Sequence, residues 1–216
     1  MHQTFENMLS DVRKLGILPV FCPSDDDDFA VITEAISRSP IRVVEITQRN
    51  EAALSRIPEI KRLIPGIVVG AGTVMQEKTV DDVIDAGADF LVAPGYTPAL
   101  VERAAQRGIP FLPGCATPTE MQDAYRTGAR VLKFFPAECM GGVAALKLYA
   151  SVFAGAAFLP TGGMSIDKIP QYLKLDNVLA CGGSYMLPKE ARAAKDVQGV
   201  YDTLMRCLAA GGRYRA

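Results

Sequence analysis

Two charged side chains interrupt apolar segments of this chain of 216 residues. Lys133 lies within the apolar segment 131–136, and Glu45 lies near the end of the apolar segment 41–46. Burial among apolar side chains favours the neutral form of a lysine, whose amine is then a nucleophile. A carboxylate close by could shuttle protons to and from a covalent intermediate. We therefore expect a lysine nucleophile with an acid/base partner. A buried Lys133–Glu45 ion pair without a catalytic role is the alternative.

The rest of the composition argues against several other chemistries. His2 is the only histidine, which disfavours a histidine-rich zinc site, a Ser-His-Asp triad and a histidine general base. The five cysteines are widely spaced, so we expect them to be reduced and unpaired. The acidic run 25–28 precedes a helical segment, and we interpret it as helix-capping residues rather than a metal cluster. We expect no metal and no organic cofactor.

The bulk properties also limit the partners of the protein. Hydrophobic residues make up 49% of the chain and charged residues 22%, the ordinary balance of a globular protein. The net charge is −1 and the basic residues are dispersed, which argues against a nucleic-acid partner. No apolar run reaches the roughly 18–20 residues that span a bilayer, and residues 1–10 lack the apolar core of a signal peptide. We expect a cytoplasmic protein with no membrane partner.

Short segments of strand character recur about every 23 residues, with helical segments between them. Strands that alternate with helices pair in parallel, because parallel neighbours need a crossover connection. Eight such units in a chain of this length favour a closed (β/α)8 TIM barrel over an open doubly wound sheet. The expected strands are 17–21, 42–46, 67–71, 90–93, 110–113, 131–134, 157–160 and 178–181.

The chain shows no linker or low-complexity tract, so we expect one α/β domain over residues 1–216. An extra N-terminal helix within 1–15, at Phe5–Leu15, is expected to cap the bottom of the barrel. The strands and helices of the barrel should occupy 16–190, and a C-terminal helix should follow in 191–216.

Polar residues and glycines gather where the expected strands end. Alternation puts Glu45 and Lys133 each on one face of its strand. If those faces point inward, both residues project into the barrel near its C-terminal mouth, where barrel active sites lie. Gly162-Gly163 and Gly182-Gly183 end the seventh and eighth strands, and Ser184 follows. Such glycines expose backbone N–H groups, so we expect a phosphate site there. Tight turns without a ligand are the alternative.

These residues and their neighbours resemble the bacterial 2-keto-3-deoxy-6-phosphogluconate (KDPG) aldolases, a family that also includes 4-hydroxy-2-oxoglutarate aldolase activity. The likeness runs from about Pro19 to Pro188. The sequence Lys-Phe-Phe-Pro-Ala-Glu at 133–138 is the most specific match. The other matching segments are 44–49, 69–74, 93–95, 141–142, 160–163 and 182–184.

The resemblance implies a class I aldolase that reversibly cleaves KDPG to pyruvate and glyceraldehyde 3-phosphate. Lys133 would form the Schiff base with the ketone, and Glu45 would act as general acid/base through a water. The resemblance also implies a homotrimer. The implied binding residues are Arg49 and Thr73 for the pyruvate carboxylate, Pro94, Phe135 and Thr161 around the pyruvate, and Gly162, Gly163 and Ser184 for the phosphate.

The sequence departs from the family pattern at two places, both expected to border the distal pocket. Cys115 stands where isoleucine or valine is usual, and Tyr185 stands where tryptophan is common. An aldolase that prefers 4-hydroxy-2-oxoglutarate or the 6-phosphogalactonate epimer is therefore an alternative. The galactonate branch typically has an arginine after the first strand, where this chain has Phe21-Cys22. An alternative of another class is a non-covalent isomerase or binding barrel for a phosphorylated ligand.

Overall fold

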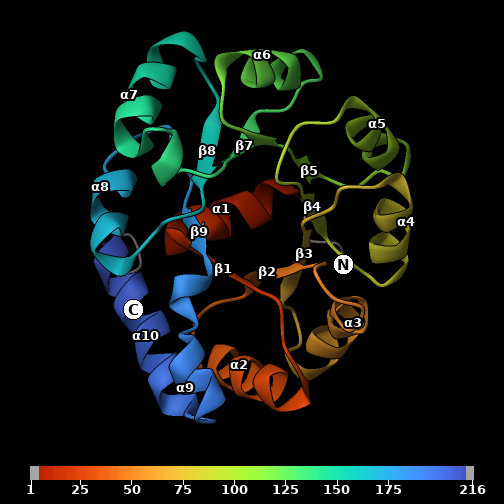
Figure 1. The fold of residues 1–216 in the computed structure, drawn as a ribbon, viewed down its shortest axis with the longest axis vertical. Helices are drawn as coiled ribbons and strands as arrows, with labels where there is room; N and C mark the ends of the chain where they lie inside the picture. The colour runs from red at the N-terminus through yellow and green to blue at the C-terminus, as the bar shows by residue number, and fades with distance from the viewer. Residues whose placement is uncertain (1–4, 213–216) are drawn as a thin grey trace.

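The computed structural model describes residues 5–212; His2 and the segment 213–216 of the expected C-terminal helix lie outside the described residues. Strands and helices alternate, and the helices surround the strands (Figure 1). The strands are β1 (Ile17–Phe21), β2 (Val43–Thr47), β3 (Val68–Gly72), β4 (Phe90–Val92), β5 (Phe111–Leu112), β6 (Gly114–Cys115), β7 (Val131–Phe134), β8 (Ala157–Pro160) and β9 (Cys181–Gly183).

The α-helices are α1 (Phe5–Leu15), α2 (Asp26–Arg38), α3 (Ala53–Leu63), α4 (Glu77–Asp85), α5 (Pro98–Gln106), α6 (Pro118–Arg126), α7 (Gly142–Val152), α8 (Ile169–Leu173), α9 (Lys189–Ala193) and α10 (Val197–Gly211). Three 3-10 turns, η1 (Glu138–Met140), η2 (Ile166–Lys168) and η3 (Ser184–Met186), follow the ends of β7, β8 and β9.

All strand pairs within the described residues are parallel, as the alternation of strands and helices predicts. One sheet has the order β5-β4-β3-β2-β1-β9, and a second has the order β6-β7-β8. The strands curl around a central space and carry the helices on their outer side (Figure 1). In the register of the sheets, Glu45 lies beside Val20 and Gly70, and Lys133 lies beside Gly114 and Leu159. The fold is therefore an α/β fold with a curled parallel sheet.

Two of the expected strands differ from the observed ones by more than a one-residue change at their ends. The segment 110–113 is not one continuous strand: β5 pairs with β4, whereas β6 pairs with β7. Pro113 lies between them and has no N–H to donate to a neighbouring strand. The last strand begins at Cys181 rather than Val178. The N–H of Val178 donates to Leu175 in the preceding turn, and Val178 pairs with Phe158 only as an isolated bridge.

Helix α1 has the bounds expected from its sequence pattern, and it lies across the centre of the strands (Figure 1). Met8, Val12 and Leu15 are buried on it at helical spacing. Met8 and Val12 pack in one cluster with residues that begin the strands, such as Val43 and Val131. Helix α1 therefore covers the end of the curled sheet at which the strands begin.

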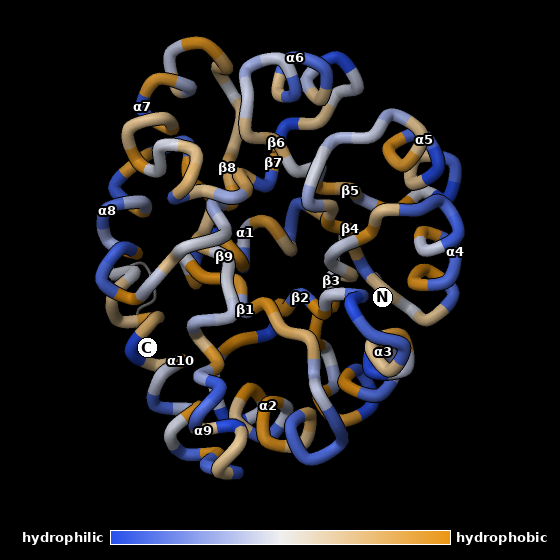
Figure 2. The backbone as a smooth tube through the Cα atoms, viewed as in Figure 1, coloured by the Kyte–Doolittle hydropathy of each residue, from blue (hydrophilic) through white to orange (hydrophobic). Residues whose placement is uncertain are grey.

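The outer helices bury one face each. Val80 and Val83 of α4 and Leu100 and Ala104 of α5 are buried against the strands. Figure 2 shows the same two helices as hydrophobic on the side that faces the strands and hydrophilic on the outer side. This pattern is that of helices packed on one sheet face.

The acidic run before α2 caps the helix, as the sequence pattern predicts. The Asp25 carboxylate accepts a hydrogen bond from the backbone N–H of Asp28 at 2.8 Å. The Asp28 carboxylate in turn pairs with Arg192 of α9 at 2.6 Å. These acids therefore anchor α2 and α9.

The packing of α1 predicts that Met8→Ala lowers the free energy of unfolding by about 2–3 kcal/mol, because it leaves a cavity beneath the strands. The expected site around Glu45 and Lys133 should be spared, because Met8 packs where the strands begin and not where they end. Urea unfolding measures the loss. Lys14→Ala, on the exposed side of α1, is the control and should cost less than about 0.5 kcal/mol. Equal losses in the two variants would contradict this role of α1.

Candidate functional site

Lys133 of β7 and Glu45 of β2 meet in the interior of the curled sheet. The Lys133 Nζ atom lies 3.2 Å from Glu45 Oε1, and their side chains are 5% and 0% exposed. The second carboxylate oxygen, Oε2, has no hydrogen-bond partner among the described residues. Val43 and Val131, each two positions earlier on the same strand, join the apolar cluster beneath the pair. The two charges therefore lie at the boundary between an apolar layer and the strand ends.

Glycines in β3 provide the space for this pair. A Cβ atom at Gly72 would lie 2.1 Å from Glu45 Oε1, closer than any real contact. A Cβ atom at Gly70 would lie 2.3 Å from the ring of Phe90. The side chain of Glu45 thus occupies the volume that any other residue at position 72 would fill.

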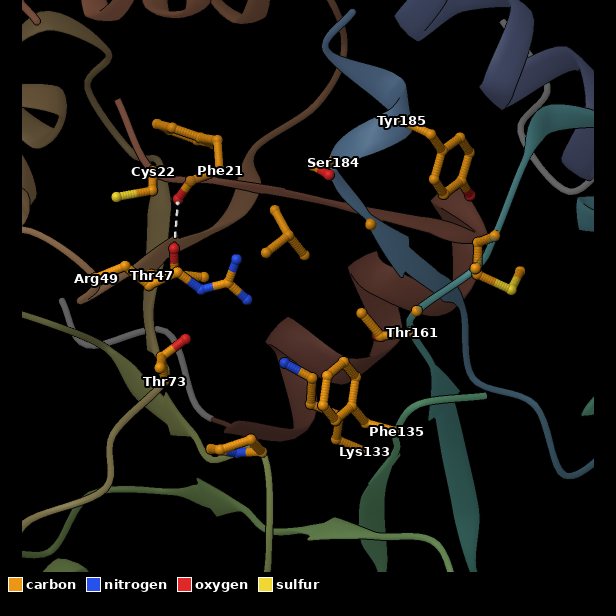
Figure 3. A pocket seen from close by; sticks show the side chains of 16 residues that line it. Phe21, Cys22, Thr47, Arg49, Thr73, Lys133, Phe135, Thr161, Ser184 and Tyr185 are labelled. Atoms are coloured by element: carbon orange, nitrogen blue, oxygen red, sulfur yellow. Dashed lines mark hydrogen bonds between the residues drawn. The ribbon is translucent and has the colours of Figure 1, made fainter. Parts of the chain in front are cut away.

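A cavity of about 230 Å³ opens above Lys133. Figure 3 shows the Lys133 amine and the Arg49 guanidinium directed into the same space, with the Phe135 ring beside the lysine. Glu45 does not line this cavity and contacts it through Lys133. The cavity walls include all the other candidate site residues: Arg49, Thr73, Pro94, Lys133, Phe135, Thr161, Gly162, Gly163 and Ser184.

One end of the cavity carries Arg49 and Thr73, which follow β2 and β3. Arg49 has no ion-pair partner among residues 5–212, so its guanidinium is available to an anion. Thr73 has a φ of 60°, a left-handed conformation that β-branched residues rarely adopt. Strained residues of this kind concentrate at binding sites. This end suits a planar carboxylate.

The other end of the cavity carries glycines and a hydroxyl. Gly162 and Gly163 have φ values of 97° and 73°, so both need a residue without a Cβ atom. A Cβ atom at Gly162 would also lie 3.2 Å from the Phe135 ring. Ser184 begins η3 directly after β9 (Figure 3). Backbone N–H groups in such a turn, together with a hydroxyl, form a suitable binding surface for a phosphate.

The cavity also contains residues that the sequence reasoning missed or placed differently. Tyr185 lines it, as expected for a residue bordering the distal pocket, and burial raises the pKa of its hydroxyl. Cys115 does not line it: this residue lies in the core, where burial and then the Glu120 charge raise the pKa of its thiol to about 12. The lining residues that were missed are Val20, Phe21, Cys22, Thr47 and Met164, whereas Gly183 belongs to a turn where a phosphate site was expected.

Position at a strand end could have identified several of these residues. Val20 and Phe21 close β1, and Thr47 closes β2 on the same face as Glu45. The Thr47 hydroxyl donates to the carbonyl of Phe21 at 3.4 Å, which ties the two strand ends together (Figure 3). Met164 lies in the loop after β8, and no sequence pattern identified it.

Neither a metal cluster nor a membrane-spanning helix is found in the described part of the chain. Within residues 5–212, no group of three or more His, Cys, Asp or Glu side chains could hold a metal ion. No helix in the same range combines the length and apolar character needed to cross a bilayer.

Known proteins are similar to this chain in sequence and in fold. The profile of a family described as KDPG and KHG aldolase matches residues 8–203. The 2-dehydro-3-deoxy-phosphogluconate aldolase of Pseudomonas aeruginosa is 39% identical over 177 residues, which is 82% of this chain and 80% of that protein.

Two solved structures are similar over most of their length. The KDPG aldolase of Legionella pneumophila, with pyruvate captured at low pH as a covalent carbinolamine intermediate, has a TM-score of 0.85 and 31% identity. The alignment covers 94% of this chain and 97% of that one. The aldolase of Zymomonas mobilis ZM4 with 3-phosphoglycerate has a TM-score of 0.82 and 36% identity, covering 90% and 94%. Sequence and fold agree with the resemblance seen in the motifs, and the chain belongs to the KDPG and KHG aldolase family, whose members are lyases.

Proposed function

We propose that this protein is a class I aldolase that reversibly cleaves KDPG to pyruvate and glyceraldehyde 3-phosphate, with Lys133 as the Schiff-base lysine. One observation carries the proposal: among residues 5–212, Lys133 is the only lysine that lines the cavity, and its amine lies 3.2 Å from a fully buried carboxylate. The covalent pyruvate carbinolamine in the Legionella pneumophila relative supports the same chemistry here.

The reaction begins at the ketone of the substrate. The neutral Lys133 amine adds to C2 and forms a carbinolamine, which loses water to give an iminium ion. Glu45 accepts protons from the ammonium and donates them to the departing hydroxyl. The iminium carries a positive charge next to C3, so it can accept the electron pair that the next step releases.

Bond cleavage needs a base at the C4 hydroxyl. A water held by Glu45 takes that proton, the C3–C4 bond breaks, and its electron pair forms an enamine on the lysine. The aldehyde leaves as glyceraldehyde 3-phosphate. Protonation of the enamine at C3 and addition of water then release pyruvate and restore the amine. Glu45 Oε2, without a protein partner among the described residues, has the free lone pairs to hold such a water.

The pyruvate half of the substrate fits the end of the cavity with Arg49 and Thr73. The Arg49 guanidinium suits the carboxylate because its planar donors match two oxygens. Pro94, Phe135 and Thr161 would enclose the short carbon chain next to the lysine. This placement brings the ketone to Lys133.

The phosphate half fits the opposite end. Gly162, Gly163 and Ser184 would supply backbone N–H groups and a hydroxyl, and the positive φ values of the two glycines favour residues without a Cβ atom in this turn. The 3-phosphoglycerate in the Zymomonas mobilis relative supports a phosphorylated three-carbon ligand in this family. No metal or organic cofactor is required by these steps.

A second candidate activity is cleavage of 4-hydroxy-2-oxoglutarate, because the matching family profile covers both KDPG and KHG aldolases. Tyr185 lines the cavity at a position where tryptophan is common in the family. This residue could therefore affect the preference between KDPG and 4-hydroxy-2-oxoglutarate. The pyruvate half is identical in the two substrates, so the distal end decides between them.

We further propose that the strands close into one (β/α)8 barrel that forms a single domain over residues 1–216. Hydrogen bonds across both gaps between the two sheets support closure. The N–H of Gly114 donates to Gly95 after β4 at 3.3 Å, and Phe158 and Thr161 of the β8 region form parallel bridges with Val178 and Gly182. In this description β5 and β6 are halves of one strand, divided at Pro113.

We also propose that the protein acts in the cytoplasm as a homotrimer, as the family resemblance implies. Leu148 and Val152 lie one turn apart on α7 and are 70% and 69% exposed, an apolar surface that an assembly would cover. No disulfide is found among the described residues, which suits a reducing compartment.

The proposed activity predicts a substrate preference. The ratio kcat/KM, measured by pyruvate release, should be at least about tenfold higher for KDPG than for 4-hydroxy-2-oxoglutarate or the 6-phosphogalactonate epimer, because only KDPG combines the phosphate with the fitting stereochemistry. A higher ratio for either competitor would reassign the substrate while leaving the lysine chemistry intact.

The contact between Gly72 and Glu45 predicts a specific loss. Gly72→Ala should slow turnover at least about 100-fold, because the new methyl group displaces the carboxylate from Lys133. Steady-state pyruvate release measures the loss, and Glu45→Gln should reproduce it. Gly95→Ala is the matched control: a Cβ atom there meets nothing within 4 Å, so turnover should stay near that of the parent protein. Full turnover in Gly72→Ala would show that the position of Glu45 is unimportant.

A further inference from the structure

Behind the Gly162-Gly163 turn lies a carboxylate that the reaction steps above do not use. Glu138 begins η1, and its carboxylate accepts hydrogen bonds from Lys168 Nζ at 2.5 Å and from the Tyr172 hydroxyl at 2.5 Å. We refer to Glu138, Lys168 and Tyr172 as the Glu138 network. None of the three lines the cavity above Lys133, so they lie behind the turn rather than in the site.

The Glu138 network contacts the turn at three points. The backbone N–H of Glu138 donates to the carbonyl of Gly162 at 3.2 Å. Lys168 Nζ donates to the carbonyl of Gly163 at 3.3 Å. A Cβ atom at Gly163 would lie 2.7 Å from Glu138 Cβ, so the glycine backbone packs directly on the Glu138 side chain. Both carbonyls of the turn are therefore held from behind.

The network is itself anchored in the fold. Tyr172 is 1% exposed on α8, and its hydroxyl fixes one carboxylate oxygen of Glu138. Burial raises the pKa of Glu138, but the hydrogen bonds from Lys168 and Tyr172 outweigh this effect and bring it below the ordinary value. Glu138 is thus ionised at neutral pH. Its charge neutralises Lys168 and directs the ammonium towards Gly163.

The two glycines need such support. A residue without a Cβ atom has wide backbone freedom, and Gly162 and Gly163 stand side by side with positive φ values. Unless the turn is fixed, its N–H groups lose orientation, and backbone donors bind an anion well only when they are aligned in advance. Contacts to both carbonyl groups constrain the peptide planes, which also sets the direction of the N–H groups.

We propose that Glu138 is a positioning residue for the phosphate end of the site, which it aligns through Lys168 and the Gly162-Gly163 turn. This inference rests on the proposed function, in which that turn binds the phosphate of the substrate. Glu138 touches neither the substrate nor Lys133. Its loss should therefore weaken recognition of a phosphorylated substrate without impairing chemistry at the ketone.

The test compares KDPG with its unphosphorylated counterpart, 2-keto-3-deoxygluconate. Glu138→Gln keeps the shape of the side chain and removes the charge, and Lys168→Met removes the donor to Gly163. In both variants the KM for KDPG should rise about tenfold, the effect of misaligned hydrogen bonds to a charged group. The kcat/KM for the unphosphorylated substrate should change less than about twofold, since that substrate lacks the phosphate.

Two further variants distinguish a positioning role of the Glu138 network from a purely structural one. Lys168→Arg keeps a cationic donor and should restore most of the affinity for KDPG. Lys174→Met, an exposed lysine at the end of α8, is the control and should behave as the parent protein. Equal losses with both substrates would mean a structural role, and unchanged or lower KM for KDPG would mean that the network does not align the turn. Either result would overturn the inference.

The parent protein distinguishes this inference from the function on which it rests. A parent protein that traps no pyruvate on reduction, or that does not prefer KDPG to its unphosphorylated counterpart, refutes the proposed function itself. A parent protein that passes both tests, with variants that show no selective loss, refutes only the role of Glu138.

Discussion

Lys133 and Glu45 lie 3.2 Å apart with almost no exposure to solvent, and the surrounding fold keeps two opposite charges in that position. Removing an ion from water costs several kcal/mol, and attraction between the two offsets this cost only when their geometry is well maintained. A lysine in this setting has an acceptor for its proton already in contact. The same burial that makes the pair costly makes the amine useful for covalent catalysis.

Several elements position and bury the Lys133–Glu45 pair. β2 lies inside the larger sheet between β1 and β3, so Glu45 comes from a strand held on both sides. Gly72 of β3 leaves the volume that its carboxylate occupies. Beneath the pair, α1 and the first residues of the strands form an apolar cluster that separates it from solvent at that end. A ligand can therefore reach the pair only from the C-terminal ends of the strands, where the cavity opens.

The two ends of the cavity carry different groups. Arg49, without an ion-pair partner among the described residues, lies at one end, and the positive-φ glycines lie at the other. In the proposed function, Lys133 stands between a carboxylate-binding end and a phosphate-binding end of this cavity. Under that proposal, the spacing would select a substrate with an acid at each end and a ketone beside one of them.

The sequence was informative wherever a residue type conflicted with its surroundings. Lys133 and Glu45 were found because charges interrupt apolar strands, and the bounds of α1 followed from the spacing of its buried residues. Arg49 and Thr73 entered only through the family resemblance, since an arginine or threonine after a strand carries no distinctive signal. The structure places both in the cavity wall.

Other features depend on contacts between segments far apart in the sequence. The need for glycine at position 72 arises from a side chain 27 positions earlier, which no local pattern encodes. The Glu138 network likewise joins η1 to η2 and α8 across the end of β8. The division of the expected fifth strand at Pro113 could have been read from the missing N–H of proline, which interrupts regular pairing. Cys115 lies beside Phe134 in the register of the sheet, and both pack in the core, whereas the neighbouring pair Gly114 and Lys133 lies one position earlier.

The central claim is that Lys133 forms a covalent bond with the keto acid, and reductive trapping tests it most directly. The protein is incubated with pyruvate and sodium borohydride, digested and analysed by mass spectrometry, with Lys133→Met as the control. The account predicts a reduced pyruvate adduct on the peptide that contains Lys133 and none in the variant. An adduct on another lysine would contradict it by reassigning the nucleophile. The absence of any adduct would contradict it and favour a barrel that binds a phosphorylated ligand without covalent chemistry.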